Sequence, residues 1–160
     1  MLSRFLATFW LPVLVLGSLA GCATSATQTR QMNRAALRQA IESEPPGDYF
    51  IGRRFYKTEY KFWGFVRSPG QPWSSARIVM LNENTKLAPD RQQGQLGSDN
   101  TYEYKLFGKF SGQTIYEPAS NGFYPEFVLK GYELRSATPP PIFRNPADTD
   151  PQRRVLPVPY

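Results

Sequence analysis

Hydrophobic and polar positions change their period near residue 48, and the two periods predict different structures. Over residues 31–44, apolar side chains recur every three or four residues, at Met32, Ala36, Leu37, Ala40 and Ile41. This spacing places them on one face of an amphipathic helix, which Pro45-Pro46-Gly47 should end. After residue 48, apolar and polar residues alternate in short runs, as in half-buried strands.

The alternation is cleanest over residues 102–110, and weaker versions of it predict strands around 56–67, 76–81, 113–117 and 126–134. Residues 84–100 contain few apolar side chains and predict a loop whose length is typical of functional or mobile segments. One helix and at least five strands predict a mainly β domain over residues 48–135, or α+β when the N-terminal helix is included. A small antiparallel barrel of five to six strands would bury the aromatic residues without long open edges.

The C-terminal segment, residues 136–160, contains seven prolines and has almost no periodicity. We expect an extended, polyproline-like tail. It can bind a partner, remain disordered, or lie as a strap along the domain through Ile142, Phe143, Val155, Leu156 and Tyr160. The sequence leaves these three roles open.

Residues 1–21 have the layout of a secretion signal: Arg4, an apolar run over 5–16, and then small residues. The run is shorter than the roughly 20 residues that a membrane-spanning helix needs. Leu19-Ala20-Gly21-Cys22 resembles the lipobox of bacterial lipoproteins. That resemblance implies cleavage between Gly21 and Cys22, diacylglycerol on the Cys22 thiol, and acylation of the new N-terminus by a fatty acid such as palmitate.

The same resemblance implies a location in the bacterial cell envelope, with the membrane as a partner through the covalent lipid. Ala23, where some lipoproteins have Asp, resembles the pattern that is sorted to the outer membrane. The small polar residues over 22–30 have the composition of a flexible tether.

Composition excludes several kinds of chemistry. The chain has one cysteine and no histidine, so Ser-His-Asp and Cys-His nucleophiles, histidine-bound metals and an internal disulfide are excluded. We therefore expect no cofactor, no metal site and no catalytic residue. The formal net charge is +6, but a nucleic-acid partner is not expected outside the cytoplasm.

Paired carboxylates are the alternative that composition leaves open, since two of them can hydrolyse a glycan across a cleft. The candidates are Glu59, Glu83, Asp90, Asp99, Glu103, Glu126 and Glu133. Ser98-Asp99-Asn100 matches one element of the penicillin-interacting serine enzymes, but the chain has no Ser-x-x-Lys nucleophile to accompany it. A small envelope glycan hydrolase is the alternative function.

Aromatic residues are abundant, with three Trp, nine Tyr and 11 Phe, and some of them are interleaved with basic residues. If exposed, they would suit sugar stacking or binding of an anionic glycan; if buried, they form the core. The candidate binding surface consists of Trp63, Phe65, Phe107, Arg53, Arg54 and Lys61.

Basic and aromatic residues interleaved on a small predicted barrel resemble the OB fold, and residues 127–133 resemble its closing strand. OB folds bind oligonucleotides, oligosaccharides and proteins, so the resemblance does not choose among these ligands. The expected function is a lipid-anchored envelope protein with a non-enzymatic binding or structural role, whose partner is a protein or an envelope glycan.

Overall fold

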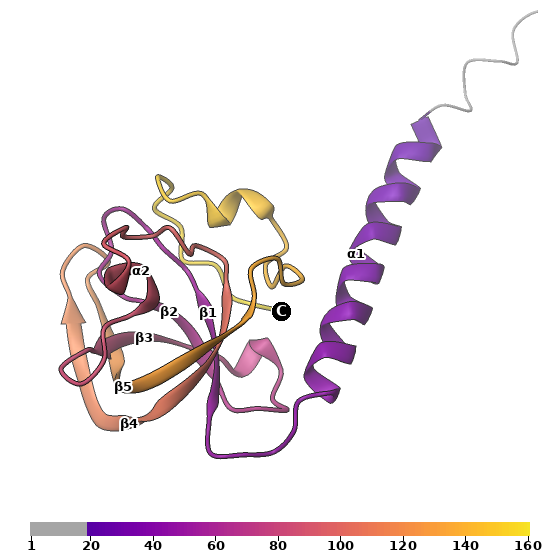
Figure 1. Cartoon of the computed structure of the whole chain (residues 1–160). Helices are drawn as coiled ribbons and strands as arrows, with labels where there is room; N and C mark the ends of the chain where they lie inside the picture. The colour runs from indigo at the N-terminus through magenta and orange to yellow at the C-terminus, as the bar shows by residue number, and fades with distance from the viewer. Residues whose placement is uncertain (1–18) are drawn as a thin grey trace, which may run out of the picture.

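The computed structural model describes residues 19–160, with side chains from residue 26 onward. The molecule is mainly β, with one closed barrel and one N-terminal helix (Figure 1). The fold class predicted from the sequence is therefore confirmed. Most of the predicted signal peptide, residues 1–21, lies outside the described residues, as does the Cys22 side chain.

Five strands form the barrel in the order β1-β2-β3-β5-β4, and β4 pairs with β1 to close it. Their bounds are Phe50–Arg54 for β1, Gly64–Arg67 for β2, Arg77–Asn82 for β3, Glu103–Glu117 for β4 and Gly122–Ser136 for β5. The strands predicted over 76–81, 102–110 and 126–134 correspond to β3, β4 and β5. Each of these has a regular apolar pattern, because one side of the strand faces the barrel interior.

One pairing departs from the predicted antiparallel barrel. Strands β3 and β5 are parallel, with Met80 opposite Glu126 and Asn82 opposite Val128. The reason is geometric: strand direction cannot alternate around a closed ring of five strands without one neighbouring pair sharing a direction. The other four pairings are antiparallel.

Two predicted strand boundaries are also wrong. The strands predicted over 102–110 and 113–117 are one strand, because β4 continues to Glu117. Gly112, at φ +86°, lies where the register of β4 against β5 is irregular. Most of the strand predicted over 56–67 is an irregular loop, and only Gly64–Arg67 pairs as β2. In that loop, the Thr58 N–H donates to the carbonyl of Pro151 in the C-terminal segment instead of to a neighbouring strand.

Helix α1 spans Leu19–Glu42, so it begins earlier than the helix predicted over 31–44. The segment 22–30, predicted to be a flexible tether, is helical. It contains no Gly or Pro, and its Ala and Gln residues form helices well. Leu37 and Ile41 of α1 pack against the domain core, whereas residues 26–32 are exposed and the helix projects away from the barrel (Figure 1).

The C-terminal residues lie as a strap along the domain. Ile142 and Phe143 are buried, and the Phe143 ring contacts the rings of Phe55 and Phe65 at 5.2 and 5.4 Å. The chain ends close to α1, where the Arg34 guanidinium lies 5.2 Å from the Tyr160 ring (Figure 1). We name residues 137–160 the C-terminal strap.

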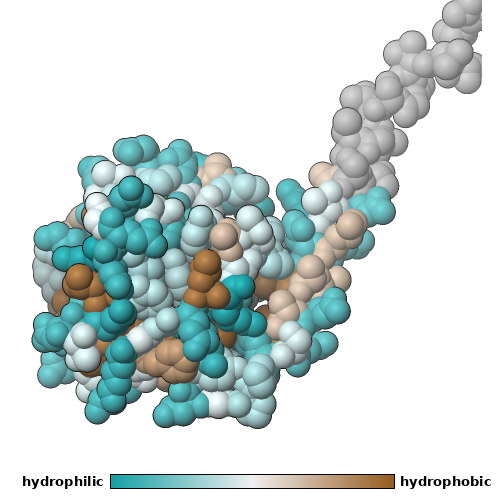
Figure 2. Space-filling model, in the orientation of Figure 1, coloured by the Kyte–Doolittle hydropathy of each residue, from teal (hydrophilic) through white to brown (hydrophobic). Residues whose placement is uncertain are grey.

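Two hydrophobic clusters hold the domain together, one around Val79, Leu106 and Phe127, the other beneath the C-terminal strap and the end of α1. On the face seen in Figure 2, exposed apolar residues form small patches separated by hydrophilic ones.

Candidate ligand-binding cleft

A cleft of about 660 Å³ opens between two irregular segments of the barrel. One wall is the loop between β1 and β2, residues 55–63, which we name the cleft loop. The other comprises the end of β3 and the following segment, residues 81–96, which includes the short helix α2, Pro89–Gln92. Half-buried Tyr56 and Tyr60 line it, together with buried Trp63 and exposed Leu96.

Arg54, at the end of β1, lies beneath the cleft and connects its walls. Its guanidinium Nη2 is 2.8 Å from Asp90 Oδ2 in α2, and its Nε is 3.4 Å from Asp99 Oδ1. The same guanidinium donates to the backbone carbonyl of Trp63 in the cleft loop. All three charged groups are buried, so this cluster fixes the floor of the cleft.

The pKa values of the two carboxylates beside Arg54 are shifted in opposite directions. Burial raises the pKa of Asp90, but Arg54 and the N–H groups of Gly97 and Arg91 outweigh it and hold the pKa below its usual value. For Asp99, burial dominates, and with the nearby charge of Asp90 it raises the pKa despite Arg54. Asp90 is therefore held ionised, whereas Asp99 binds its proton more readily than an ordinary carboxyl.

The C-terminal strap supports the cleft loop from outside. Lys57 is buried, and its ammonium donates to the carbonyls of Asp148 at 2.6 Å and Asp150 at 2.7 Å. Asn100 adds a second link, because it accepts from the Tyr56 N–H and donates to the Thr149 carbonyl, both at 2.9 Å. The cleft loop is thus held by hydrogen bonds to distant segments.

Glu117, at the end of β4, holds the other end of the cleft loop. Its buried carboxylate accepts from the hydroxyl and N–H of Ser120 and from the N–H of Ala119, and the backbone of Lys61 in the cleft loop also lowers its pKa. Burial raises the pKa of Glu117, but these hydrogen bonds lower it further than burial raises it. Nearby, the Phe62 and Tyr124 rings are 5.6 Å apart. The β4–β5 turn therefore also fixes the loop.

Glu83 gives the opposite wall a second attachment to the sheet. Glu83 follows β3, and its Oε2 lies 3.0 Å from the Arg91 guanidinium. Its Oε1 accepts from the Ala88 N–H at 3.1 Å, just before α2. Glu83 therefore positions α2 relative to the sheet and leaves the Arg91 side chain at the cleft rim.

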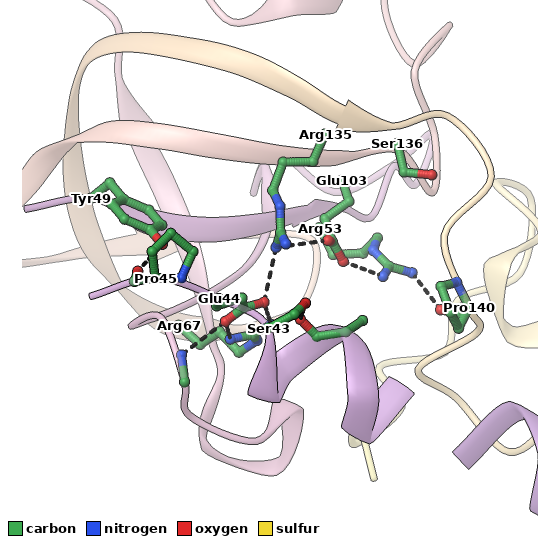
Figure 3. A network of polar contacts seen from close by, with 12 residues as sticks. Ser43, Glu44, Pro45, Tyr49, Arg53, Arg67, Glu103, Arg135, Ser136 and Pro140 are labelled. Atoms are coloured by element: carbon green, nitrogen blue, oxygen red, sulfur yellow. Dashed lines mark hydrogen bonds and ion pairs between the residues drawn. The ribbon is translucent and has the colours of Figure 1, made fainter. Parts of the chain in front are cut away.

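A second ionic cluster lies away from the cleft and joins α1 to the barrel (Figure 3). Glu44, just after the helix, accepts two hydrogen bonds from Arg67, at 2.6 and 2.7 Å, and one from Arg135 at 2.9 Å. Arg135 also contacts Glu103, which pairs with Arg53. Each of these charges has an opposite partner, so the cluster serves as a structural clamp.

The six residues predicted as a binding surface do not share one exposed surface. Trp63, Phe65, Arg53 and Arg54 are at most 4 % exposed, Phe107 is half-buried, and Lys61 is exposed. The condition of exposure is not met at most of these positions, because the two arginines have buried acidic partners and the Phe65 ring packs against Phe143. Only Arg54, Lys61 and Trp63 line the cleft.

Several lining residues were missed from the sequence. The alternating pattern predicts Tyr56 and Tyr60 as members of a strand, and it places Arg91 in a long loop without further structure. The available signals were the break in alternation after residue 62 and the length of the 84–100 segment.

Three of the seven candidate carboxylates line the cleft: Glu59, Glu83 and Asp90. Each is ion-paired, with Arg154, Arg91 and Arg54 respectively. Asp99, whose pKa is raised, lines a separate pocket with Tyr104 and Tyr132. Within residues 26–160, whose side chains the structure describes, no group of three acidic, cysteine or histidine side chains is arranged to hold a metal ion.

In the same described range, none of the helices has the length and apolar character needed to cross a membrane. A search of protein-family models, of curated proteins and of solved structures finds no match to this chain.

Proposed function

We propose that this chain is a lipid-anchored cell-envelope protein whose barrel binds an envelope ligand, a protein or a glycan, in the cleft without converting it chemically. The observation that carries the proposal is the support of the cleft loop from both sides, by the C-terminal strap at Lys57 and by the β4–β5 turn at Glu117. A pre-formed site loses little conformational entropy on binding, which favours affinity.

The ion pairs in the cleft support a binding role over a hydrolytic one. A glycosidase of the usual kind needs one carboxyl with a raised pKa to protonate the leaving oxygen. Arg54 helps to hold the pKa of Asp90 below its usual value, and Glu83 is bonded to Arg91 and to the Ala88 N–H. These contacts suit carboxylates that maintain the shape of the cleft.

The alternative, a small glycan hydrolase, rests on the presence of Glu59, Glu83 and Asp90 in one cleft. Incubation of the mature chain with soluble envelope glycans, followed by mass spectrometry of the products, tests it. Cleavage that is lost in Glu83→Gln would establish hydrolysis and contradict the non-enzymatic proposal.

The anchor is tested with Cys22→Ser in a bacterial host. We expect the normal chain to fractionate with membranes in a form that is sensitive to inhibition of lipoprotein signal peptidase by globomycin. The variant should lose the lipid and leave the membrane fraction. Retention of Cys22→Ser at the membrane would contradict the lipid anchor.

The binding site is tested with a photo-reactive amino acid at position 61, at the cleft, and at position 109, on an exposed part of β4 outside it. In the native envelope, we expect an adduct from position 61 and none from position 109. Equal labelling from both positions would contradict the cleft as the binding site.

A further inference from the structure

From the charges in the cleft, we infer that its ligand is an uncharged oligosaccharide; this inference rests on the proposed binding function. The charges lining the cleft balance, with Arg54, Lys61 and Arg91 against Glu59, Glu83 and Asp90. Most of these charges are also paired locally, because Arg54 pairs with Asp90, Arg91 with Glu83, and Glu59 with Arg154 outside the cleft. Among the described lining residues, only Lys61, at the exposed rim, is left without an acidic partner.

The basic residues that would have attracted an anionic glycan are already engaged. Arg53 pairs with Glu103 and Arg67 with Glu44, both away from the cleft. The Lys57 ammonium is buried against two carbonyls. Within residues 26–160, Lys61 is the only cation at the cleft without an acidic partner. Apart from Lys61 at the exposed rim, the described part of the cleft offers no unpaired charge, so a charged ligand that enters it would have to break an existing ion pair or lose hydration without compensation, and both are costly.

The remaining surface of the cleft offers apolar area beside hydrogen-bonding groups. Tyr60 is half-buried against Phe62, with ring centroids 5.2 Å apart, so the pair forms an aromatic wall. Leu96 is 61 % exposed on the opposite side. Thr58, Lys61 and Arg91 place a hydroxyl, an ammonium and a guanidinium at the exposed rim.

A pyranose ring matches this arrangement, because it combines apolar C–H faces with a rim of uncharged hydroxyls. The faces can lie on the Tyr60 ring, and the hydroxyls can bond the rim groups without disturbing the ion pairs. The cleft volume of about 660 Å³ falls within the usual range for small-molecule sites and suits a short oligosaccharide.

The test is a calorimetric titration of the unlipidated mature chain, Cys22→Ser, with a panel of short oligosaccharides. The panel contains neutral N-acetylglucosamine, glucose and galactose oligomers, a cationic de-acetylated glucosamine oligomer and an anionic uronic-acid oligomer. We expect a neutral member to bind, with an affinity that changes less than about twofold between roughly 0.05 and 0.5 M NaCl, because an uncharged ligand carries no charge whose attraction to the cleft salt could screen.

Tyr60→Ala should weaken this binding about tenfold, whereas Tyr60→Phe retains the aromatic face and should bind nearly normally. Tyr116→Ala removes an exposed aromatic ring outside the cleft and should change nothing. Unchanged circular dichroism in each variant separates loss of contact from loss of fold. Normal binding by Tyr60→Ala would overturn the assignment of the aromatic wall.

The outcomes separate this inference from the proposed function. Binding confined to charged oligomers, or a protein adduct at position 61 with no neutral oligomer bound at millimolar concentration, would overturn the uncharged-sugar inference and leave the cleft as a binding site. Equal crosslinking from positions 61 and 109 would overturn the proposed function itself.

Discussion

Glu44 illustrates how single buried carboxylates determine the acid stability of this protein. Burial raises its pKa, but hydrogen bonds from Arg67, Gly70 and Arg135 outweigh burial, and the net pKa lies below the ordinary value of 4.5. The folded state therefore releases this proton more readily than the unfolded chain does. The resulting stabilisation is complete above the ordinary pKa and disappears as the pH falls through the lowered one.

Glu44→Gln should accordingly lower the free energy of unfolding by about 3 kcal/mol near neutral pH, because it leaves Arg67 buried without its anion. At an acid pH below the lowered pKa, where the normal Glu44 is also protonated, the difference between the two proteins should shrink. Urea denaturation at both pH values measures this, with the exposed helical Glu42→Gln as the control. A difference that stays constant between the two pH values would contradict the ionic role of Glu44.

The contacts of single residues also explain why the candidate site could be only partly predicted from the sequence. Arg53 and Arg54 appear as surface residues in a linear pattern, because their acidic partners lie 50 and 36 residues away along the chain. Lys57 contacts carbonyls 91 and 93 residues away. Composition indicated that a basic and aromatic site was available, but only the fold determines which charges are already paired.

At the scale of elements, regular strands were predictable and irregular segments were not. The alternation of Tyr104 and Leu106 with Lys105 follows directly from burial of one side of β4. The cleft loop has no comparable pattern, because its conformation depends on the C-terminal strap and the β4–β5 turn. The first part of α1 is not predictable in the same way, because the small polar residues over 22–30 have the composition of a flexible tether.

Gly108 provides a test of how β4 bends. It lies at a register shift against β5, and a Cβ there would be 2.2 Å from the Val128 carbonyl oxygen. Gly108→Ala should therefore destabilise the protein by about 2–3 kcal/mol, measured by urea denaturation. Gly131→Ala is the matched control on the paired strand, since its Cβ would meet Phe107 at an ordinary 3.6 Å. Similar stability of both variants would contradict a steric requirement for glycine at 108.

The contact between the C-terminal strap and the cleft loop gives a second prediction. Lys57→Met would leave the Asp148 and Asp150 carbonyls without their charged donor and should cost about 2–3 kcal/mol. Amide hydrogen exchange should accelerate over residues 55–63 and 148–151. Lys61→Met, an exposed change in the same loop, should leave exchange over 148–151 unaltered. Normal exchange in Lys57→Met would show that the strap does not hold the loop.

At the scale of the whole molecule, the continuous helix α1 changes how far from a membrane the barrel is expected to be held. If Cys22 carries the proposed lipid, the residues from there to Leu37, where α1 meets the domain core, form a helical spacer about 22 Å long. Fluorescence energy transfer from a labelled barrel to a membrane dye should report one narrow distance. Gln31→Pro, which interrupts the helix, should shorten and broaden it, whereas Gln31→Ala should not. Identical distances for both variants would contradict a rigid spacer.

Closure of the barrel also has a kinetic consequence. The pairings that complete it, Met80 with Glu126 and Phe50 with Leu106, join segments that are far apart in the chain. Such contacts form only after large loops have closed, and domains dominated by them fold in about milliseconds to seconds, much more slowly than helical bundles. Helix α1 can form early, but the cleft exists only after both distant pairings are made, so ligand binding should appear with the slowest refolding phase.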